Sequence, residues 1–225
     1  MNFELSYIPK RTEKPRESGL TMMMDKGLSI NEIENFIQSS GHLTDIVKFG
    51  FGTAFVTKDI ERKLEMYREA NIRPYFGGTL FEVFFARGMF EDFVRLLDKY
   101  QLDLVEVSDG SIIIDHDEKC EIIQSLAKDR TVLSEVGSKD SGIIVSPGKW
   151  IKMMSTELEA GSWKVIAEGR ESGTVGIFRP NGTAHTLLIN RIISKVNPDD
   201  ILWEAPIKKQ QVWFIKLFGH NVNPW

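Results

Sequence analysis

Short apolar segments recur along the chain about every thirty residues, and this spacing constrains the fold more than any other feature of the sequence. Each segment is rich in β-branched residues, leucine or methionine, which is typical of strands that are buried on both faces. The predicted strands are Leu20–Asp25, Ile46–Phe49, Arg73–Phe76, Leu104–Val107, Thr131–Glu135, Val165–Glu168 and Ile201–Glu204. Glycine follows most of them within a few residues.

Amphipathic patterns that are typical of helices fill the intervals between these strands. The predicted helices are Ile30–Ser39, Lys58–Ala70, Phe90–Tyr100, Asp117–Lys128, Lys149–Ala160, Leu187–Lys195 and Ile207–Phe218. Such alternation of strands and helices occurs in closed parallel barrels and in doubly wound open sheets.

The charged residues at the strand ends separate the two folds. Six predicted strands end at or near such a residue: Asp25, Lys48, Glu106, Glu135, Glu168 and Glu204. An open sheet binds its ligand at one switch point, whereas a barrel collects side chains from all of its strands at the C-terminal face. The sequence therefore predicts a TIM (β/α)8 barrel, with the open sheet as the alternative.

The length of the chain fits a single barrel domain over residues 1–225. An eighth strand would have to be Gly219–Trp225, and no eighth helix is encoded after it. We therefore expect a barrel that lacks its last helix and whose seam between the first and seventh strands is weakly closed.

Composition restricts the class of protein. The chain is 42% hydrophobic and 27% charged, and no apolar run approaches the roughly 20 residues that cross a bilayer. The N-terminus lacks the apolar core of a signal peptide, and the single cysteine, Cys120, excludes an internal disulfide framework. A cytoplasmic protein without a membrane partner is expected. The net charge of −4, without a basic helix or run, argues against nucleic acid as a partner.

Among the glycine loops, Gly77-Gly78-Thr79 is the best candidate for binding an anion. Consecutive backbone N–H groups and a hydroxyl precede a helix start predicted at Leu80, which is typical of an anion nest. Each glycine could instead serve only a tight turn. The Gly50-Phe51-Gly52 segment lacks the third glycine of a dinucleotide fingerprint, and no Walker A pattern occurs, so neither NAD nor ATP is indicated.

Carboxylates and cations gather at the same predicted rim. Several carboxylates without a nearby histidine suit a hard cation such as Mg²⁺, although they could also form structural ion pairs with lysines. The cations at or just beyond strand ends are Lys26, Lys48, Lys139 and Arg170. Together these groups suggest a small polyanionic substrate that is held with a divalent ion, whereas any one lysine could simply be solvated. No Ser-His-Asp or Cys-His arrangement indicates a covalent hydrolase.

Short segments spread over essentially the whole chain resemble those of the phosphosulfolactate synthases. They are Asp25–Leu28, Val47–Gly50, Gly77–Glu82, Glu106–Ser111, Ser134–Gly137, Glu168–Gly173, Glu204–Pro206, Gln210–Val212 and Asn221–Asn223. The resemblance implies a (β/α)8 barrel that depends on Mg²⁺ and adds sulfite to phosphoenolpyruvate, giving (2R)-phospho-3-sulfolactate. In that family the product leads to coenzyme M in methanogens and to sulfolactate in some bacteria.

The resemblance also implies roles for particular residues. Lys139 matches the lysine that the family is thought to use as the general acid. We expect Lys26, Lys48 and Arg170, with the backbone of Gly77 and Gly78, to hold the phosphate, carboxylate or sulfite groups. Glu106, Glu135 and Glu168 are the expected metal-side carboxylates, and a homo-oligomer is expected.

The sequence departs from the family in one respect that bears on the site. Family members continue for about two dozen residues past the segment that matches Asn221–Asn223, and loops near the end of such barrels often grip phosphate. Phe51 and Ser138 are interpreted as variation within the family. Two alternatives remain open: a non-catalytic interaction protein like the plant heat-stress proteins that resemble these synthases, and an enolate-forming lyase that uses another nucleophile.

Overall fold

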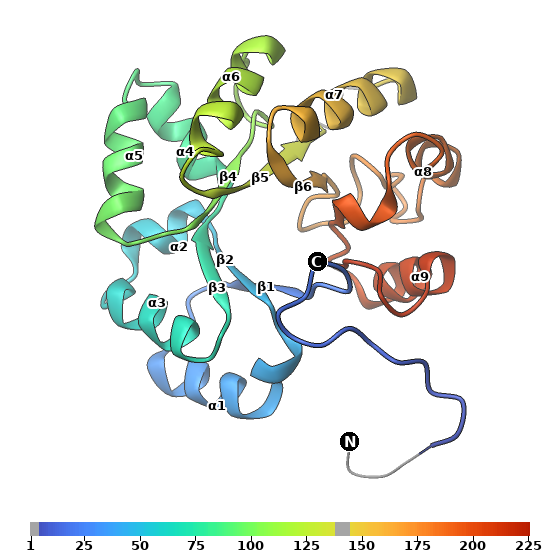
Figure 1. Cartoon of the computed structure of the whole chain (residues 1–225), viewed down its shortest axis with the longest axis horizontal. Coiled ribbons are helices and arrows are strands. Elements are labelled where there is room, and N and C mark those ends of the chain that lie inside the picture. Colours follow the sequence, from blue (N-terminus) through green and yellow to red (C-terminus); the bar gives the residue numbers. More distant parts are fainter. Residues whose placement is uncertain (1–4, 138–144) are drawn as a thin grey trace.

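A computed structural model describes residues 5–137 and 145–225. Its strands lie at the centre with the helices arranged around them, as in a TIM barrel (Figure 1). The strands are β1 (Met22–Asp25), β2 (Ile46–Phe49), β3 (Arg73–Phe76), β4 (Leu104–Val107), β5 (Thr131–Val136), β6 (Ser162–Ala167) and β7 (Ile201–Trp203). The α/β barrel class predicted from the sequence is confirmed, and all seven predicted strands are present.

The ladders between these strands are parallel and follow the chain order. They form one sheet in the order β1-β2-β3 and a second in the order β4-β5-β6-β7. Side chains join the two sheets where β3 lies beside β4: Tyr75 Oη donates to Glu106 Oε2 at 2.6 Å, and the Arg73 guanidinium donates to Asp103.

The helices are α1 (Ile30–Ser40), α2 (Phe51–Val56), α3 (Ile60–Glu69), α4 (Gly78–Phe85), α5 (Phe90–Lys99), α6 (His116–Leu126), α7 (Pro147–Glu159), α8 (Thr186–Ile193) and α9 (Lys208–Phe218). Seven match the predicted helices within about two residues at either end. The short helix α2 was not predicted and occupies a predicted glycine loop, whereas α4 begins at Gly78, two residues before its predicted start at Leu80. In both cases an extended glycine, Gly50 or Gly77, caps the helix start. None of the described helices is both long enough and apolar enough to cross a membrane.

Strand periodicity separates an inner core from two outer cores. The inner cluster consists of Leu20, Met22, Ile46, Tyr75, Leu104, Leu133, Ile166 and Leu202, which come from all seven strands or their starts. The residues between them along each strand, such as Val47 on β2 and Val105 on β4, pack in the outer clusters with helix side chains. This alternation is the period of two that every strand imposes on its side chains.

The last residues of the chain lie beside β7, in the position predicted for an eighth strand. Trp203 N donates to Asn223 O and Trp225 N donates to Trp203 O, both at 2.9 Å, and Pro224 forms a parallel bridge with Trp203. The Asn223 side chain then accepts from Leu20 N at 3.0 Å, just before β1. The seam that was expected to be weakly closed is therefore bridged by an asparagine side chain.

Candidate active site at the barrel mouth

A layer of charged side chains covers the inner apolar core at the C-terminal ends of the strands. Each member stands two residues after a core residue of the same strand, so it points to the same side. Lys48 follows Ile46 in this way, and the other pairs are Leu104 with Glu106, Leu133 with Glu135, Ile166 with Glu168 and Leu202 with Glu204. All five charged residues are buried. The convergence predicted from the strand ends is thus present, except at β1.

Asp25 at the end of β1 belongs to a different environment, because its position is out of phase with the inner residue Met22. Its carboxylate accepts from Tyr67 Oη at 3.0 Å and lies 3.7 Å from Lys63 Nζ, both on α3. It also accepts from Gly27 N and Leu28 N, which hold the loop after β1. Asp25 therefore anchors this loop to the surrounding helix.

Three carboxylates of the layer form a group that could hold a metal ion. One oxygen from each of Glu135, Glu168 and Glu204 lies within 4.8 Å of the others, and all three residues are buried. Among the described residues, this is the group of metal-ligand type that the fold brings together. Glu135 and Glu168 were predicted from the sequence as metal-side carboxylates, with Glu106 as the third. In the structure, Glu204 is the third carboxylate of the group.

The electrostatics of the group are those of crowded like charges. Burial, and then the neighbouring charge of Glu135, raise the pKa of Glu204 to about 6, against the lowering influence of Lys48 and a backbone hydrogen bond from Gly169. Glu204 Oε2 accepts from Gly169 N at 2.7 Å and from Arg170 N at 2.9 Å. The loop after β6 is therefore attached to the end of β7 through this carboxylate.

Lys48 is the cation of the layer. Its Nζ donates to Glu106 Oε1 at 3.0 Å and lies 3.9 Å from Glu135 Oε2, and it stands 4.2 Å from the ring centroid of Trp225. Burial acts to lower the pKa of Lys48, but the charges of Glu106, Glu135 and Glu204 outweigh it and raise the pKa. Lys48 is consequently a permanent positive charge between carboxylates.

Glu106 and the two predicted loop glycines pack tightly beside Lys48. Glu106 accepts from Lys48, from Tyr75 Oη and, at 2.7 Å, from Gly78 N. A Cβ at Gly77 would stand 2.6 Å from Lys48 Cε, and one at Gly78 would stand 2.7 Å from Glu106 Oε1. Close packing against the charged layer thus accounts for both glycines, and the anion-nest role of Gly77 and Gly78 stays a prediction.

The remaining predicted cations lie at the rim. Lys26 is exposed and pairs with Glu171 at 2.8 Å, which joins the loops after β1 and β6. Arg170 has an exposed side chain and a left-handed backbone with φ 59°, and its N–H donates to Glu168 Oε1 at 2.8 Å as well as to Glu204. Lys139 lies outside the described residues.

Three buried polar side chains around the mouth were not predicted. They are Tyr75, which binds Glu106, together with Glu82 on α4 and Lys119 on α6, which hold the loop after β4. Tyr75 had a signal in the sequence, because it is a polar aromatic residue within a short strand and is itself the β3 member of the inner cluster. Lys119 lies on a helix whose pattern resembles that of an ordinary amphipathic surface, and Glu82 is the one charged residue of a short, mostly apolar helix. Only the tertiary structure shows that both side chains point inward.

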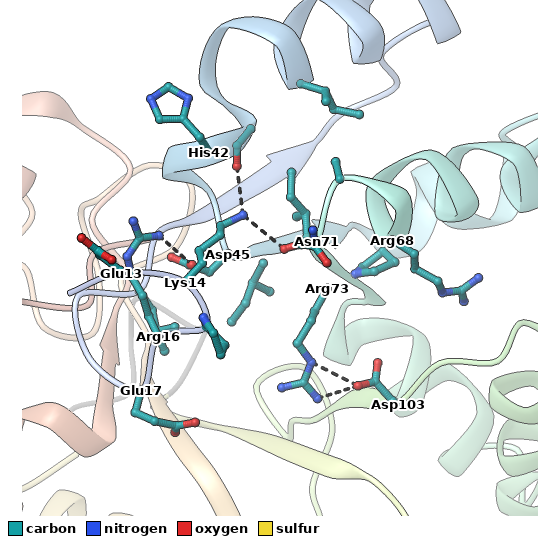
Figure 2. A pocket seen from close by; sticks show the side chains of 18 of the residues that line it. Glu13, Lys14, Arg16, Glu17, His42, Asp45, Arg68, Asn71, Arg73 and Asp103 are labelled. Atoms are coloured by element: carbon teal, nitrogen blue, oxygen red, sulfur yellow. Dashed lines mark hydrogen bonds and ion pairs between the residues drawn. The ribbon is translucent and has the colours of Figure 1, made fainter. Parts of the chain in front are cut away.

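A cavity of about 1190 Å³ lies at the opposite end of the barrel, where the strands begin. Figure 2 shows Arg73 facing Asp103 and Arg16 facing Asp45 within it. The cavity is lined by four lysines or arginines, namely Lys14, Arg16, Arg68 and Arg73, and by four acids, namely Glu13, Glu17, Asp45 and Asp103. Its acids and bases are equal in number, and Arg16 and Arg73 each pair with an acid, so we place the candidate active site at the charged layer and not in this cavity.

Comparisons with proteins of known structure support the barrel fold. The YdjI aldolase from Escherichia coli K12 aligns over 92% of this chain and 74% of its own, with a TM-score of 0.59 and 9% identity. The carboxyl transferase domain of Rhizobium etli pyruvate carboxylase aligns over 93% of this chain and 39% of its own, with a TM-score of 0.63 and 14% identity. At such identities the likeness concerns the fold alone.

Sequence comparisons are more specific. Residues 9–224 match the family model of (2R)-phospho-3-sulfolactate synthase, ComA. The phosphosulfolactate synthase of Bacillus subtilis is 36% identical over 219 residues, covering 96% of this chain and 87% of the relative. That of Methanocaldococcus jannaschii is 38% identical over 214 residues, covering 92% and 85%. The chain that places these carboxylates at a barrel mouth therefore belongs to the phosphosulfolactate synthase family.

Proposed function

We propose that this protein catalyses the Mg²⁺-dependent addition of sulfite to phosphoenolpyruvate, giving (2R)-phospho-3-sulfolactate. The observation that carries the proposal is the buried layer of one lysine and four glutamates at the mouth of a barrel of this family. An enzyme that joins sulfite to phosphoenolpyruvate must bind two anions side by side, and a mouth that combines a fixed cation with a group of oxygen ligands is suited to this task.

The group of Glu135, Glu168 and Glu204 fits Mg²⁺. Its donors are all hard oxygens, and the raised pKa of Glu204 reflects burial and then the neighbouring charge of Glu135, both of which a bound cation would offset. We therefore propose these three residues as the metal-side carboxylates, with Glu106 bound to Lys48 and Tyr75 beside them. When bound, Mg²⁺ supplies a positive charge that offsets the negative charge building up on the substrate carboxylate.

The residues of the chain bind the anions and move the proton. We propose that Arg170 and Lys26, which are exposed at the rim, attract the phosphate and the sulfite, and that Lys48 gives the mouth its fixed positive charge. The sulfur lone pair forms a bond to the methylene carbon of phosphoenolpyruvate, and the electrons of the double bond move toward the carboxylate as an enediolate. The Lys139 ammonium then donates a proton to the adjacent carbon and recovers one from solvent.

Product analysis tests this proposal. The protein is incubated with sulfite, phosphoenolpyruvate and Mg²⁺, and phosphosulfolactate is sought by mass spectrometry; chelator-treated protein should lose activity and regain it when Mg²⁺ is added. Parallel reactions in which other small nucleophiles replace sulfite test for a different enolate-forming lyase. A protein that forms no product with any nucleophile would instead support the non-catalytic alternative.

The role of Lys139 is tested with Lys139→Met, which keeps much of the side-chain length but carries no proton. General acid catalysis predicts a fall in kcat of roughly 10²–10⁴-fold with a smaller change in the binding of phosphoenolpyruvate. Turnover within a few-fold of the unaltered protein would remove Lys139 from the mechanism and direct attention to Lys26 and Lys48.

A further inference from the structure

Lys119 on α6 is a fully buried lysine behind the barrel mouth, and it has no part in the chemistry proposed above. Its side chain is 0% exposed. Its Nζ donates to Glu135 O at 2.7 Å and to Asp109 Oδ1 at 2.9 Å, and it lies 2.9 Å from Glu157 Oε1. Two of the three N–H donors of this ammonium group thus have hydrogen-bond acceptors, and Glu157 adds a carboxylate at ion-pair distance.

The three partners come from three different elements around the mouth. Asp109 belongs to the loop after β4, Glu135 lies near the end of β5, and Glu157 is on α7. The ladder between β4 and β5 ends at Val107 and Ser134, so Glu135 lies one residue past the last β4 partner. Lys119 thus supplies a donor to a strand carbonyl at the point where the neighbouring strand no longer pairs with it.

The loop after β4 is held from a second side by Glu82 on α4. The Glu82 carboxylate accepts from Ser108 Oγ, and from Gly110 N and Ser111 N at 3.1 Å each. Lys119 and Glu82 therefore fix one loop between two buried charges, and only Lys119 also reaches the strand that carries Glu135.

Stability alone does not explain a buried charge of this kind. Burial acts to lower the pKa of Lys119, and the charges of Glu157 and Asp109 outweigh it and raise the pKa, so the ammonium stays charged. Apolar residues of similar volume often stabilise a fold as well as or better than a buried ion pair does. What this arrangement adds is a fixed position for the groups that it holds.

We propose that Lys119 is a positioning residue: by holding the backbone of Glu135 and the Ser108–Ser111 loop, it keeps the Glu135 carboxylate beside those of Glu168 and Glu204. The inference rests on the proposed function, because it assigns the held carboxylate to the group that binds the metal ion and serves the reaction.

The test compares Lys119→Met with Arg16→Met. Both variants remove the cation of a buried ion pair, but the pair of Arg16 with Asp45 lies at the opposite end of the barrel. Lys119→Met should lower kcat/KM by ~10–100-fold, mainly through kcat, and weaken Mn²⁺ binding in a calorimetric titration at least ~10-fold, as loss of an outer-shell partner of a metal site does. Arg16→Met should change both quantities by less than three-fold.

Two further variants separate positioning from folding. Glu157→Gln added to Lys119→Met removes the buried charge that is left unpaired, so it should restore stability to chemical denaturation without restoring kcat or Mn²⁺ affinity. Asp109→Asn should weaken the hold on the loop and lower kcat about 10-fold, with a smaller loss of stability than in Lys119→Met, because its amide oxygen can still accept from Lys119 and Glu157 still pairs with it. The inference is overturned if the double variant regains the activity of the unaltered protein, or if Lys119→Met and Arg16→Met lose activity equally.

If the proposed function is wrong, the unaltered protein itself will form no product, and the activities of the variants will say nothing about Lys119. Hydrogen exchange would then decide whether Lys119 holds these segments. Residues 106–111 and 131–136 should exchange faster in Lys119→Met and at an unchanged rate in Arg16→Met; unchanged rates in both variants would reject the inference.

Discussion

Both ends of the barrel carry charged residues, but the two ends arrange them in opposite ways. At the base, Arg16 lies 2.8 Å from Asp45 and Arg73 lies 2.8 Å from Asp103, around a cavity of about 1190 Å³. At the mouth, Glu135, Glu168 and Glu204 bring their oxygens within 4.8 Å of one another, with Lys48 as the nearby cation. Opposite charges thus pair at one end, and like charges crowd at the other.

This contrast indicates which end serves chemistry. Paired charges that bridge strands, loops and the N-terminal segment have a sufficient explanation in the fold. Crowded carboxylates cost stability, and a chain keeps such an arrangement where function needs it. The comparison also shows that volume is a poor guide here. The cavity lies at the end where opposite charges pair, although large pockets are the usual first choice for a binding site.

Removal of an ion pair at the base of the barrel should affect stability more than activity. Arg16→Met removes one partner of a pair whose side chains are both 8% exposed, and it leaves Asp45 with a hydrogen bond from Thr21 N. Loss of one partner of a buried pair predicts a decrease in the free energy of unfolding of about 3–5 kcal/mol, measured by urea denaturation. The values of kcat and KM should stay within three-fold. A collapse of kcat in folded Arg16→Met would show that the base takes part in function.

Removal of a carboxylate at the mouth of the barrel should affect activity more than stability. Glu168→Gln removes one charge from the crowded group, so we expect kcat/KM to fall about 10²–10³-fold, the range for loss of one preorganised electrostatic contact. The free energy of unfolding should stay the same or rise, because repulsion is relieved. Glu121→Gln, at an exposed position of α6, is the matched control. If Glu168→Gln lost stability and kept its activity, Glu168 would belong with the structural pairs of the base.

The pH dependence of stability sharpens the comparison. The pKa of Glu204 is about 6 in the folded protein against an ordinary value of 4.5, so between these pH values the folded state holds a proton that the unfolded chain has released. Stability should therefore fall as pH rises through this window, by about 2 kcal/mol in total. Glu204→Gln should lose this part of the pH dependence of stability, and the variant should be more stable than the unaltered protein above pH 6. Urea denaturation at pH 4.5 and at pH 7.5 measures the free energy of unfolding of both proteins. An equal pH dependence in the two proteins would contradict the raised pKa of Glu204.

The smallest expected effect concerns the rim. Arg170→Lys keeps the charge but loses the planar fork, so transition-state binding should weaken by about 1.5 kcal/mol, the low end for a charged hydrogen bond. Arg179→Lys, at an exposed position in the same loop, serves as the control and should leave kcat/KM unchanged. Equal kinetics in Arg170→Lys and the unaltered protein would assign the Arg170 side chain to a structural role.

The sequence by itself determined the strands and the longer helices. Every predicted strand is present because buried parallel strands need continuous apolar runs, and this local property does not depend on how the barrel closes. The phase of each strand could also be read: Glu106, Glu135, Glu168 and Glu204 each stand two residues after an inner leucine or isoleucine, whereas Asp25 is out of phase with Met22. The short helix α2 escaped prediction, and the start of α4 was placed two residues late at Leu80, because glycine and phenylalanine are frequent in both segments and an amphipathic period needs more turns to appear.

Only the tertiary structure decided which charged residues meet. The phase of a strand gives the side of the sheet to which a carboxylate points, but the distance between two carboxylates across a barrel depends on strand stagger and closure, which couple residues far apart in the chain. For this reason Glu204, and not Glu106, joins Glu135 and Glu168, while Glu106 is taken up by Lys48, Tyr75 and Gly78. Lys119 shows the same limit, because its surroundings of Asp109, Glu135 and Glu157 come into being only when α6 packs between the loop after β4 and α7.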